Sequence, residues 1–426
     1  MGGLGGDDSG HLNHLYEDYS LTFGELKSTL ASVINSEITL YEKVDGQNLS
    51  LTHDPRSHAS YAARNKTDIK ARGIDKKQLN KRYSDKSKER VREAFTDALV
   101  AFNEAVTDLV YYQRFQTFDS DQGGVPFVNL EVMAVDNPNV IKYDRNYLVM
   151  HGVTRYKPGT AKGRACKSTF QEITKLINGS IVKSPDSEKV WFIKGPTEID
   201  LSRTSNKGLM KKALKDLAVF MKENHLEDDD TISDYLENQI VVDHLKAFSM
   251  TSEVESAFLN RMLDVPGALP TPSIVKGMNP IMRSALSDLA RDRRQIVRNA
   301  IMPLELIINK FGIGLLENSH SIFVDDGPSQ VKELRARVKS AVKRLFKDGT
   351  DRTKTVLKMN YDKLDNDVEM ITSTVEGVVF SSPLTGKSYK ITGAFAPVNQ
   401  ILGMDNPAFA KSRTVEKPLA TPLYVA

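Results

Sequence analysis

Cysteine is almost absent from this sequence of 426 residues, which contains only Cys166. One thiol cannot form a disulfide within the chain, and it cannot supply a zinc site built from several cysteines. The composition therefore suits a reducing compartment and argues against a structural metal centre. We expect Cys166 to be a small buried side chain.

A strong net charge is also missing, because 58 lysines and arginines face 55 aspartates and glutamates. Overall charge gives no sign of a nucleic-acid partner, which would have to be bound by local basic patches. Residues 1–10 contain neither a basic nor an apolar segment, and no run reaches the length needed to span a bilayer. We expect a soluble, cytoplasmic protein that has no contact with membranes.

Hydrophobic residues make up 40% of the chain, enough for two or three cores, and their pattern changes along it. Residues 22–203 and 354–400 mix helical periodicity with strand-like alternation, whereas helical periodicity dominates residues 204–353. Thr22 and Glu25 predict a capped helix at the start of the first region. The pattern predicts an α+β core of antiparallel sheets and helices, interrupted by an all-helical insert domain. Residues 1–21 are expected to be disordered or extended, and residues 401–426 to form a tail.

One short run, Tyr41-Glu42-Lys43-Val44-Asp45-Gly46, places a lysine at the end of an expected strand, just before an Asp-Gly turn. A free lysine has a pKa of about 10.4, but an amine attacks phosphorus only when it is neutral. A nucleophilic lysine therefore needs nearby positive charge, metal ions or removal of water to lower its pKa. On these few positions alone, an ordinary solvated lysine beside a turn is the better interpretation, so the other motifs decide the matter.

Six segments follow one another in the order of a known set of motifs. They are Lys43–Asn48, Arg64, Leu130–Val132, Tyr147–Val153, Glu376–Val379 and Tyr389–Ile391. Their order resembles that of the covalent nucleotidyltransferase superfamily, and most closely the ATP-dependent, phage-type nick-sealing RNA ligases. The resemblance covers most of the chain and implies the ligase-like nucleotidyltransferase fold for residues 22–203 and 354–400.

The resemblance also implies a role for each matched residue. Lys43 would be the nucleophile, and Glu376 the carboxylate that serves a catalytic Mg²⁺. Contacts to the nucleotide are implied for Glu42, Asn48, Arg64, Glu131, Met150 and Lys390. Contacts to nucleic acid are implied for Asn48, Lys66, Lys70 and Arg72.

The implied activity is ATP-dependent ligation of polynucleotides, with RNA favoured over DNA. Lys43 would form a lysyl-AMP, AMP would pass to a 5′-phosphate, and a 3′-hydroxyl would seal the strand. One alternative is another covalent nucleotidyltransferase, capping-like or adenylating and using GTP, because the Tyr147–Val153 segment does not read the base convincingly. A second is a degenerate ligase fold that serves as a nucleic-acid-binding or structural module. A third is a core that serves an assembly recruited through the helical insert.

Several positions depart from the family pattern. The last motif usually has two lysines one residue apart, but here Ser388 and Thr392 flank Lys390 at those positions, with Lys387 as a possible substitute from the turn. Ser381 replaces the lysine often found five residues after the glutamate of Glu376–Val379. The 34 residues that follow Thr392 leave no room for a separate C-terminal domain, which the helical insert is expected to replace.

Two basic segments have an open interpretation. Residues 64–82 contain eight lysines and arginines, and the expected helix over 330–346 spaces Arg335, Lys339 and Lys343 at four-residue intervals, with Lys347 following. Both patterns are typical of a solvated helix surface. They are also what a surface that grips a phosphate backbone requires.

Overall fold

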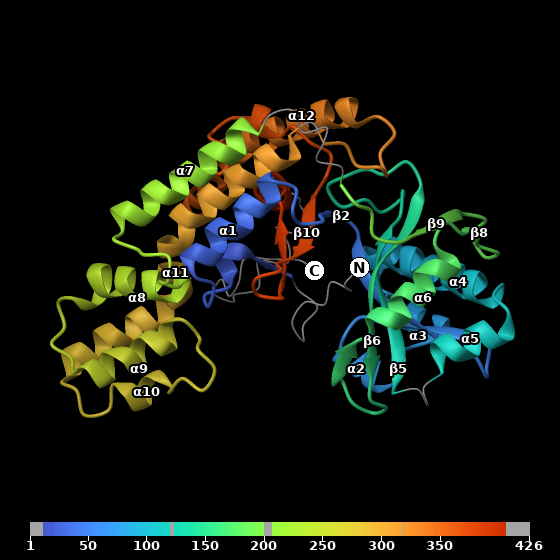
Figure 1. Cartoon of the computed structure of the whole chain (residues 1–426), viewed down its shortest axis with the longest axis horizontal. Helices are drawn as coiled ribbons and strands as arrows, with labels where there is room; N and C mark the ends of the chain where they lie inside the picture. Colours follow the sequence, from blue (N-terminus) through green and yellow to red (C-terminus); the bar gives the residue numbers. More distant parts are fainter. Residues whose placement is uncertain (1–11, 120–122, 200–206, 318, 406–426) are drawn as a thin grey trace.

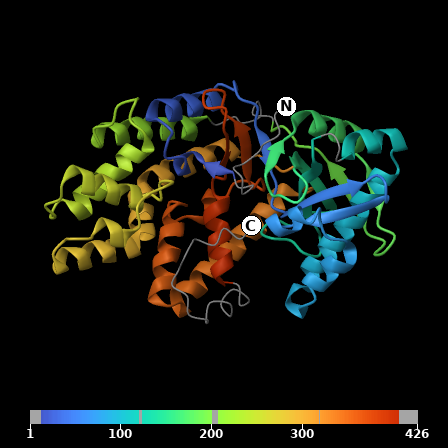
Figure 2. The same ribbon diagram turned by 90° about the horizontal axis from the view of Figure 1, so that it is seen from below.

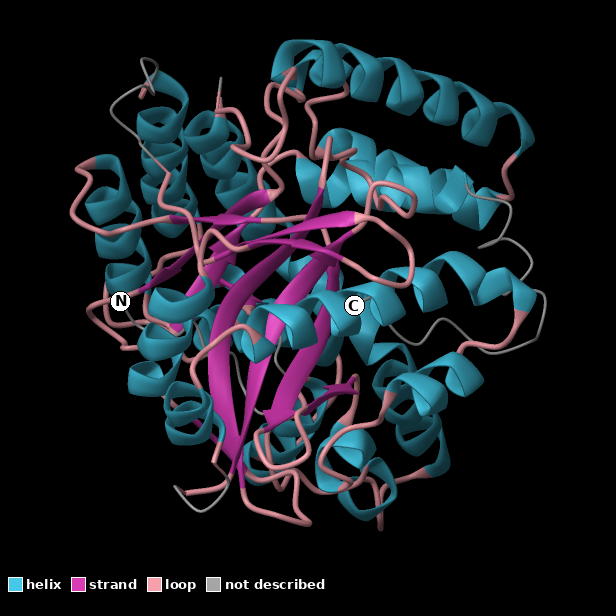
Figure 3. Ribbon diagram, turned by 90° about the vertical axis from the view of Figure 1, so that its right-hand side faces the viewer, coloured by secondary structure: helices cyan, strands magenta, loops and turns pink. Residues whose placement is uncertain are grey.

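The computed structural model describes residues 12–119, 123–199, 207–317 and 319–405. It is a mixed α/β protein in which curled sheets lie among many helices, as Figures 1 and 3 show. This architecture is compatible with the predicted α+β class.

A seven-stranded sheet, the large sheet, is built from residues that are close together in sequence. Its strands pair in the order β4-β3-β5-β6-β9-β8, with β7 paired to β6, and only β6 and β9 run parallel. The strands are β3 (Gln47–Asp54), β4 (Ala59–Ala63), β5 (Val125–Met133), β6 (Asn146–Tyr156), β7 (Gly163–Ala165), β8 (Ile181–Lys183) and β9 (Val190–Lys194).

Helices cover one face of the large sheet because alternate residues of its strands are apolar. Leu130 and Leu148 are fully buried there against Phe95 and Phe102 of helix α4. The helices of this half are α2 (Lys66–Lys70), α3 (Lys76–Arg82), α4 (Glu89–Thr107), α5 (Tyr111–Phe118) and α6 (Lys167–Ile177). The strand residues between the apolar ones, such as Glu131, are on the opposite face.

A four-stranded sheet, the small sheet, draws on residues that are far apart in sequence. Its order is β1-β11-β10-β2, with β1 parallel to β11 and the other pairs antiparallel. The strands are β1 (Asn13–His14), β2 (Tyr41–Lys43), β10 (Gly377–Ser381) and β11 (Ser388–Ile391). Gly377 has to be a glycine, because a Cβ there would lie 2.5 Å from the carbonyl oxygen of Ile391.

The region predicted as a helical insert is helical, but the helices do not form a core of their own. α7 and α11 pack with α1 and with the small-sheet residues Val378 and Ile391, whereas α12 and α13 pack with Val44 and Ile141. The helices of this region are α7 (Gly208–Glu223), α8 (Ile232–Ile240), α9 (Ser252–Met262), α10 (Thr271–Ile274), α11 (Pro280–Leu316), α12 (Gly327–Asp348) and α13 (Asp351–Asp362). Two helices outside it are α1 (Phe23–Ile34) and α14 (Phe395–Asp405). The helical region therefore extends past the predicted boundary at residue 353.

The helices α8, α9 and α10 project away from both sheets, at the lower left of Figure 1, and Figure 2 shows the same separation from below. Residues 227–274, which contain them, have ten aspartates and glutamates against two lysines and arginines. This part of the region predicted as an insert is thus strongly acidic.

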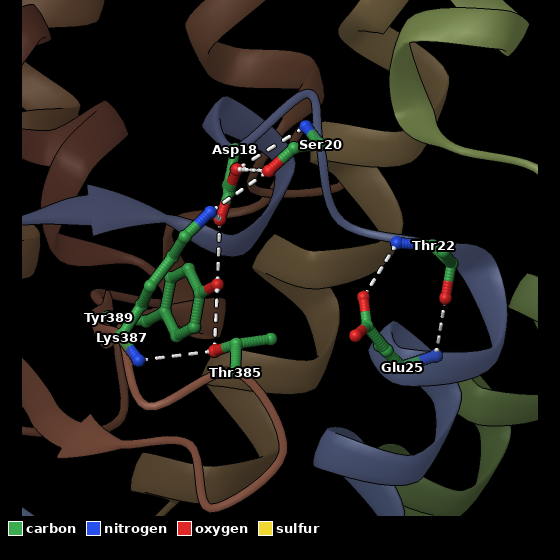
Figure 4. A network of polar contacts seen from close by, with 7 residues as sticks. All are labelled: Asp18, Ser20, Thr22, Glu25, Thr385, Lys387 and Tyr389. Atoms are coloured by element: carbon green, nitrogen blue, oxygen red, sulfur yellow. Dashed lines mark hydrogen bonds and ion pairs between the residues drawn. The ribbon is translucent and has the colours of Figure 1, made fainter.

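The predictions for the chain ends need correction. Within residues 12–21, β1 belongs to the small sheet and Leu15 and Leu21 are buried, so this stretch is ordered where disorder or extension was expected. The side chain of Asp18 accepts hydrogen bonds from Lys387 (2.8 Å) and from the hydroxyl of Tyr389 (2.7 Å), beside the predicted Thr22–Glu25 cap of α1 (Figure 4). At the other end, residues 401–405 continue α14; residues 1–11 and 406–426 lie outside the described residues.

Helix α11 is long and apolar enough to cross a membrane by length and composition, contrary to the expectation from sequence. In the folded chain 56% of its most apolar stretch is buried. Burial of this kind is consistent with a core helix of a soluble protein.

Candidate active site

Lys43 is the last residue of β2 and lies opposite Gly377 of β10, so strand pairing brings it to the residue that precedes β10. The Nζ atom of Lys43 lies 2.5 Å from Oε1 of Glu376, a residue 333 positions away in the chain. Lys390 of β11 pairs with Val379 of β10 and with His14 of β1, and therefore lies on the same sheet. The small sheet thus assembles Lys43, Glu376 and Lys390.

Where a tight Asp-Gly turn was predicted, Val44, Asp45 and Gly46 form an irregular link from β2 of the small sheet to β3 of the large sheet, here called the lysine loop. Backbone and side-chain contacts from residues 139–143 hold this loop in place. Oδ2 of Asp45 accepts hydrogen bonds from the amides of Val140 (2.7 Å) and Ile141 (2.8 Å). The amide of Asp45 donates to the hydroxyl of Tyr143 at 2.8 Å. Asp45 therefore fixes the backbone next to the lysine.

Gly46 is the last residue of the lysine loop before β3 of the large sheet. A Cβ at Gly46 would lie 2.9 Å from Cβ of Glu131 and 3.1 Å from its Oε2 atom. Only a residue without a side chain allows Glu131 to come this close to the lysine loop. Two separate requirements thus explain the Asp-Gly pair. The carboxylate of Asp45 binds the amides of Val140 and Ile141, and the absence of a Cβ at Gly46 leaves room for Glu131.

Glu131 of β5 is paired with Asn48 on the neighbouring strand β3 of the large sheet. Its Oε2 atom is buried and has no hydrogen-bond partner among the described residues. Burial, together with the carboxylates of Glu376 and Asp45, raises the pKa of Glu131 to about 8 although Lys43 opposes the shift. A buried acceptor without a donor is costly unless a ligand supplies one.

The charges around Lys43 favour its protonated form. Burial alone would lower the pKa of Lys43, but the carboxylates of Glu376, Glu131 and Asp45 outweigh it, so the pKa is raised. Burial and Glu376 raise the pKa of Asp45 to about 7. The lysine becomes a nucleophile only if positive charge from elsewhere weakens its attraction to these carboxylates.

Arg64 and Asn48 lie next to each other. The guanidinium of Arg64 donates to the backbone carbonyl of Asn48 and stacks on the ring of Phe95, with 5.0 Å from Cζ to the centroid. The side-chain amide of Asn48 donates to Asn129 at 2.6 Å. The structure therefore places Asn48 beside Glu131 and anchors Arg64 to the same strand.

The carboxylates of Asp45, Glu131 and Glu376 around Lys43 form what we call the Lys43 cluster. Two of the residues predicted to bind nucleotide do not reach it. Met150 is fully buried with Leu130 in the core on the helix-covered face of the large sheet, because its neighbour Val149 pairs with Glu131 and successive side chains alternate. Glu42 alternates with Lys43 along β2 and accepts a 3.4 Å hydrogen bond from the amide of Ile322. Burial raises the pKa of Glu42 to about 7.

The residues predicted to bind nucleic acid are accessible. Lys66 and Lys70 are exposed on α2, and Arg72 is exposed in the following turn with φ +63°. No described contact links these three side chains to the Lys43 cluster. Their role stays a prediction.

Lys387, the possible substitute for the second lysine of the last motif, is turned toward the N-terminal segment. Its Nζ atom binds Asp18 and Ser20 of the N-terminal segment, at 2.8 and 2.9 Å (Figure 4). Another lysine, Lys363 at the end of α13, instead lies near Lys390, and both lower the pKa of the buried His14 in addition to its burial.

Three further residues lie in this charged region, and of these only His151 falls within a matched segment, Tyr147–Val153. His14 belongs to a two-residue strand, Lys363 follows α13 and pairs with Glu305 of α11, and His151 occupies a β-bulge of β6. Burial first, and then Lys43, lowers the pKa of His151 to about 4. Only the assembly of distant elements reveals that these side chains belong to the region.

The chemistry of the site fits a hard cation, because Glu376, Glu131 and Asp45 offer carboxylate oxygens around Lys43. Among the described residues, however, no group of three aspartate, glutamate, histidine or cysteine side chains has the arrangement of a preformed metal site. A Mg²⁺ that keeps most of its water and is shared with a phosphate substrate needs only one or two such ligands.

The chain matches no protein-family model, no curated protein and no solved structure.

Proposed function

We propose that this chain is a covalent nucleotidyltransferase of the polynucleotide-ligase type, in which Lys43 attacks ATP and carries AMP. The observation that supports the proposal most directly is the meeting of Lys43 with Glu376, 2.5 Å away, at the edge where Gly46 admits Glu131. Three residues picked by motif order alone, and up to 333 positions apart, come together there.

In the proposed first step the lone pair on Nζ of Lys43 bonds to the α-phosphorus of ATP. The bond from that phosphorus to the oxygen that bridges it to the β-phosphate breaks, and pyrophosphate leaves. Before this step the ammonium of Lys43 has to release a proton to water, although Glu376 and its neighbours stabilise the protonated form in the resting protein. A Mg²⁺ bound at Glu376 would supply the positive charge that weakens this hold.

The chain's own residues have matching tasks. The partnerless Oε2 of Glu131 is suited to accept a hydrogen bond from a ribose hydroxyl, and Asn48 holds the adjacent strand. Lys390 and Arg64 provide positive charge for the phosphates. Lys363 lies in the same charged region as Lys390, but it is buried and paired with Glu305, so it does not replace the missing lysine of the last motif.

The later steps rest on the motif resemblance. AMP passes from Lys43 to the 5′-phosphate of a nucleic-acid strand, which forms a pyrophosphate linkage and regenerates the amine. A 3′-hydroxyl then attacks the 5′-phosphate, the strand is sealed and AMP leaves. RNA is the proposed strand, and the cytoplasm the proposed location.

The test is incubation of the purified protein with α-labelled ATP or GTP and Mg²⁺, followed by a denaturing gel and mass spectrometry. Lys43→Arg keeps the charge beside Glu376 but removes the nucleophile, and Lys387→Arg is the matched control in the loop between β10 and β11. We expect an acid-labile AMP adduct in the parent and the control, and a loss of at least about 1,000-fold in Lys43→Arg.

The outcomes are distinct. A GMP adduct would point to capping-like chemistry on the same lysine. No adduct with either nucleotide, from folded protein, would overturn the proposal and leave a binding module. An adduct that persists in Lys43→Arg would assign the nucleophile elsewhere.

A further inference from the structure

Helix α12 carries two sets of basic side chains that differ in what they contact. Its arginines are bound to the rest of the protein: Arg335 to Glu369, Arg337 to the carbonyl of Val140 (3.1 Å) and Arg344 to Asp405 (Nε–Oδ1 3.0 Å). These contacts explain why the arginines are present. They fasten the helix and leave nothing to bind a ligand.

The lysines of α12 form a separate row, which we call the lysine stripe: Lys332, Lys339, Lys343 and Lys347. All four are exposed, and within the described parts of the chain none has an ion pair or hydrogen bond to another side chain. At about 100° per residue they fall within an arc of about 80°, opposite the buried Leu334, Val338 and Leu345. The stripe is about 22 Å long.

Charge is concentrated on this part of the molecule. Residues 327–362, which form α12 and α13, contain ten lysines and arginines against four aspartates and glutamates, a net charge of +6, whereas the whole chain has +3. The acidic residues 227–274 lie on the projecting helices instead. A polyanion that approaches the protein is therefore attracted to α12 and repelled by α8–α10.

Helix α12, which carries the stripe, is held against the segment that contacts the lysine loop (Val44, Asp45 and Gly46). Beside it, Glu333 pairs with Lys142 at 2.5 Å, and Gln330 donates to the carbonyl of Lys142 at 2.7 Å. Lys142 belongs to the segment whose amides hold Asp45, and Val338 of α12 shares a core with Val44. A strand bound along α12 would thus keep a fixed position relative to Lys43.

We propose that the lysine stripe binds the phosphodiester backbone of the RNA strand on which the Lys43 site acts. This inference rests on the proposed function for the identity of the strand, but the surface itself is argued from charge and contacts. Lys339, Lys343 and Lys347 at four-residue intervals, about 6 Å apart along the helix, present point charges without reading bases, and Lys332 extends the row by about 10 Å. Binding is therefore independent of sequence and sensitive to salt.

The experiment measures fluorescence anisotropy of a labelled 20-nucleotide RNA with the full-length protein at several salt concentrations. The stripe variant is Lys339→Gln/Lys343→Gln/Lys347→Gln. The matched control is Lys211→Gln/Lys212→Gln/Lys215→Gln, which removes three exposed lysines from another helix, α7. Formation of the AMP adduct is measured on every variant.

We expect the stripe variant to bind RNA at least about tenfold more weakly and to lower the salt slope by about 2, while the control changes affinity less than about threefold. Adduct formation stays at the parent level in both. Equal losses in the two variants, or none in the stripe variant, would overturn the inference. If no variant forms an adduct, the proposed function fails, whereas the RNA measurement still decides whether the stripe binds the backbone.

Discussion

The two sheets that meet at Lys43 handle charge in opposite ways. In and beside the small sheet two lysines each have a carboxylate in contact: Lys43 lies against Glu376, and Lys363 near its edge is paired with Glu305. In the large sheet Glu131 and His53 are held without an opposite charge in contact, and Oε2 of Glu131 and Nε2 of His53 are buried without a hydrogen bond among the described residues. These two ion pairs, the closed network, contrast with the unmet polar groups of the large sheet.

This difference suggests a division of labour. Paired charges keep a nucleophile protonated and protected until a substrate and cation arrive, while an unmet acceptor is a place where a ligand gains free energy. Variants in or beside each sheet test this difference between paired and unpaired groups.

The largest effect on stability is expected from Lys363→Met, which leaves the buried carboxylate of Glu305 without its partner. Lys363 is 5% exposed and Glu305 14%. The free energy of unfolding should fall by about 3–5 kcal/mol in urea titrations at pH 7. The double variant Glu305→Gln/Lys363→Met should recover more than half of the loss, and a single variant as stable as the parent would contradict the closed network.

Glu131→Gln and Glu376→Gln should shift stability in opposite directions. Glu131→Gln removes a carboxylate whose pKa is raised to about 8, so it should stabilise the protein at pH 7 by on the order of 1–3 kcal/mol. Glu376→Gln separates a bonded pair and should destabilise it by about 1–3 kcal/mol. Both should slow adduct formation at least about tenfold. Urea midpoints that move the same way would remove the distinction between the sheets.

His53 tests the large sheet by pH. It is buried on β3, with Nδ1 3.0 Å from the hydroxyl of Ser60, and burial lowers its pKa from 6.5 to about 4. Below pH 6.5 the imidazole of His53 binds a proton in the unfolded chain, whereas in the folded protein it stays neutral down to about pH 4. Stability therefore falls as the pH drops through this window, by on the order of 2 kcal/mol at pH 5.

His53→Gln should lose that part of the pH dependence, which urea midpoints at pH 7 and pH 5 would measure. A variant with the same difference between the two midpoints as the parent would show that another group is responsible.

The smallest effect is expected from Lys387→Ala. Lys387 is 53% exposed, so its ion pair with Asp18 is screened by water and should contribute less than about 1 kcal/mol. Adduct formation should not change, because the side chain faces the N-terminal segment (Figure 4). A loss of adduct would restore Lys387 as a phosphate ligand.

Some of the site was predictable because its signals are local. The Thr22–Glu25 cap and the strand ending at Lys43 are confirmed, since each depends on residues a few positions apart. The tight Asp-Gly turn is not, because Val44, Asp45 and Gly46 form an irregular link between strands of two different sheets. Met150 was placed at the site by motif position, but strand alternation turns it into the opposite core. A shift of one residue reverses the face of a side chain, and sequence alone does not determine that register.

Sequence alone was enough to find the helix that starts at Thr22, the strand that ends at Lys43 and the predominantly helical character of residues 204–353. The tertiary structure alone decided that Glu376 reaches Lys43 across 333 residues and that α12 splits its cations into bound arginines and a free lysine stripe. It also brought the unmarked residues His14 and Lys363 to Lys390. The physical reason is that these contacts depend on strand register and helix packing between distant elements, which no local pattern encodes.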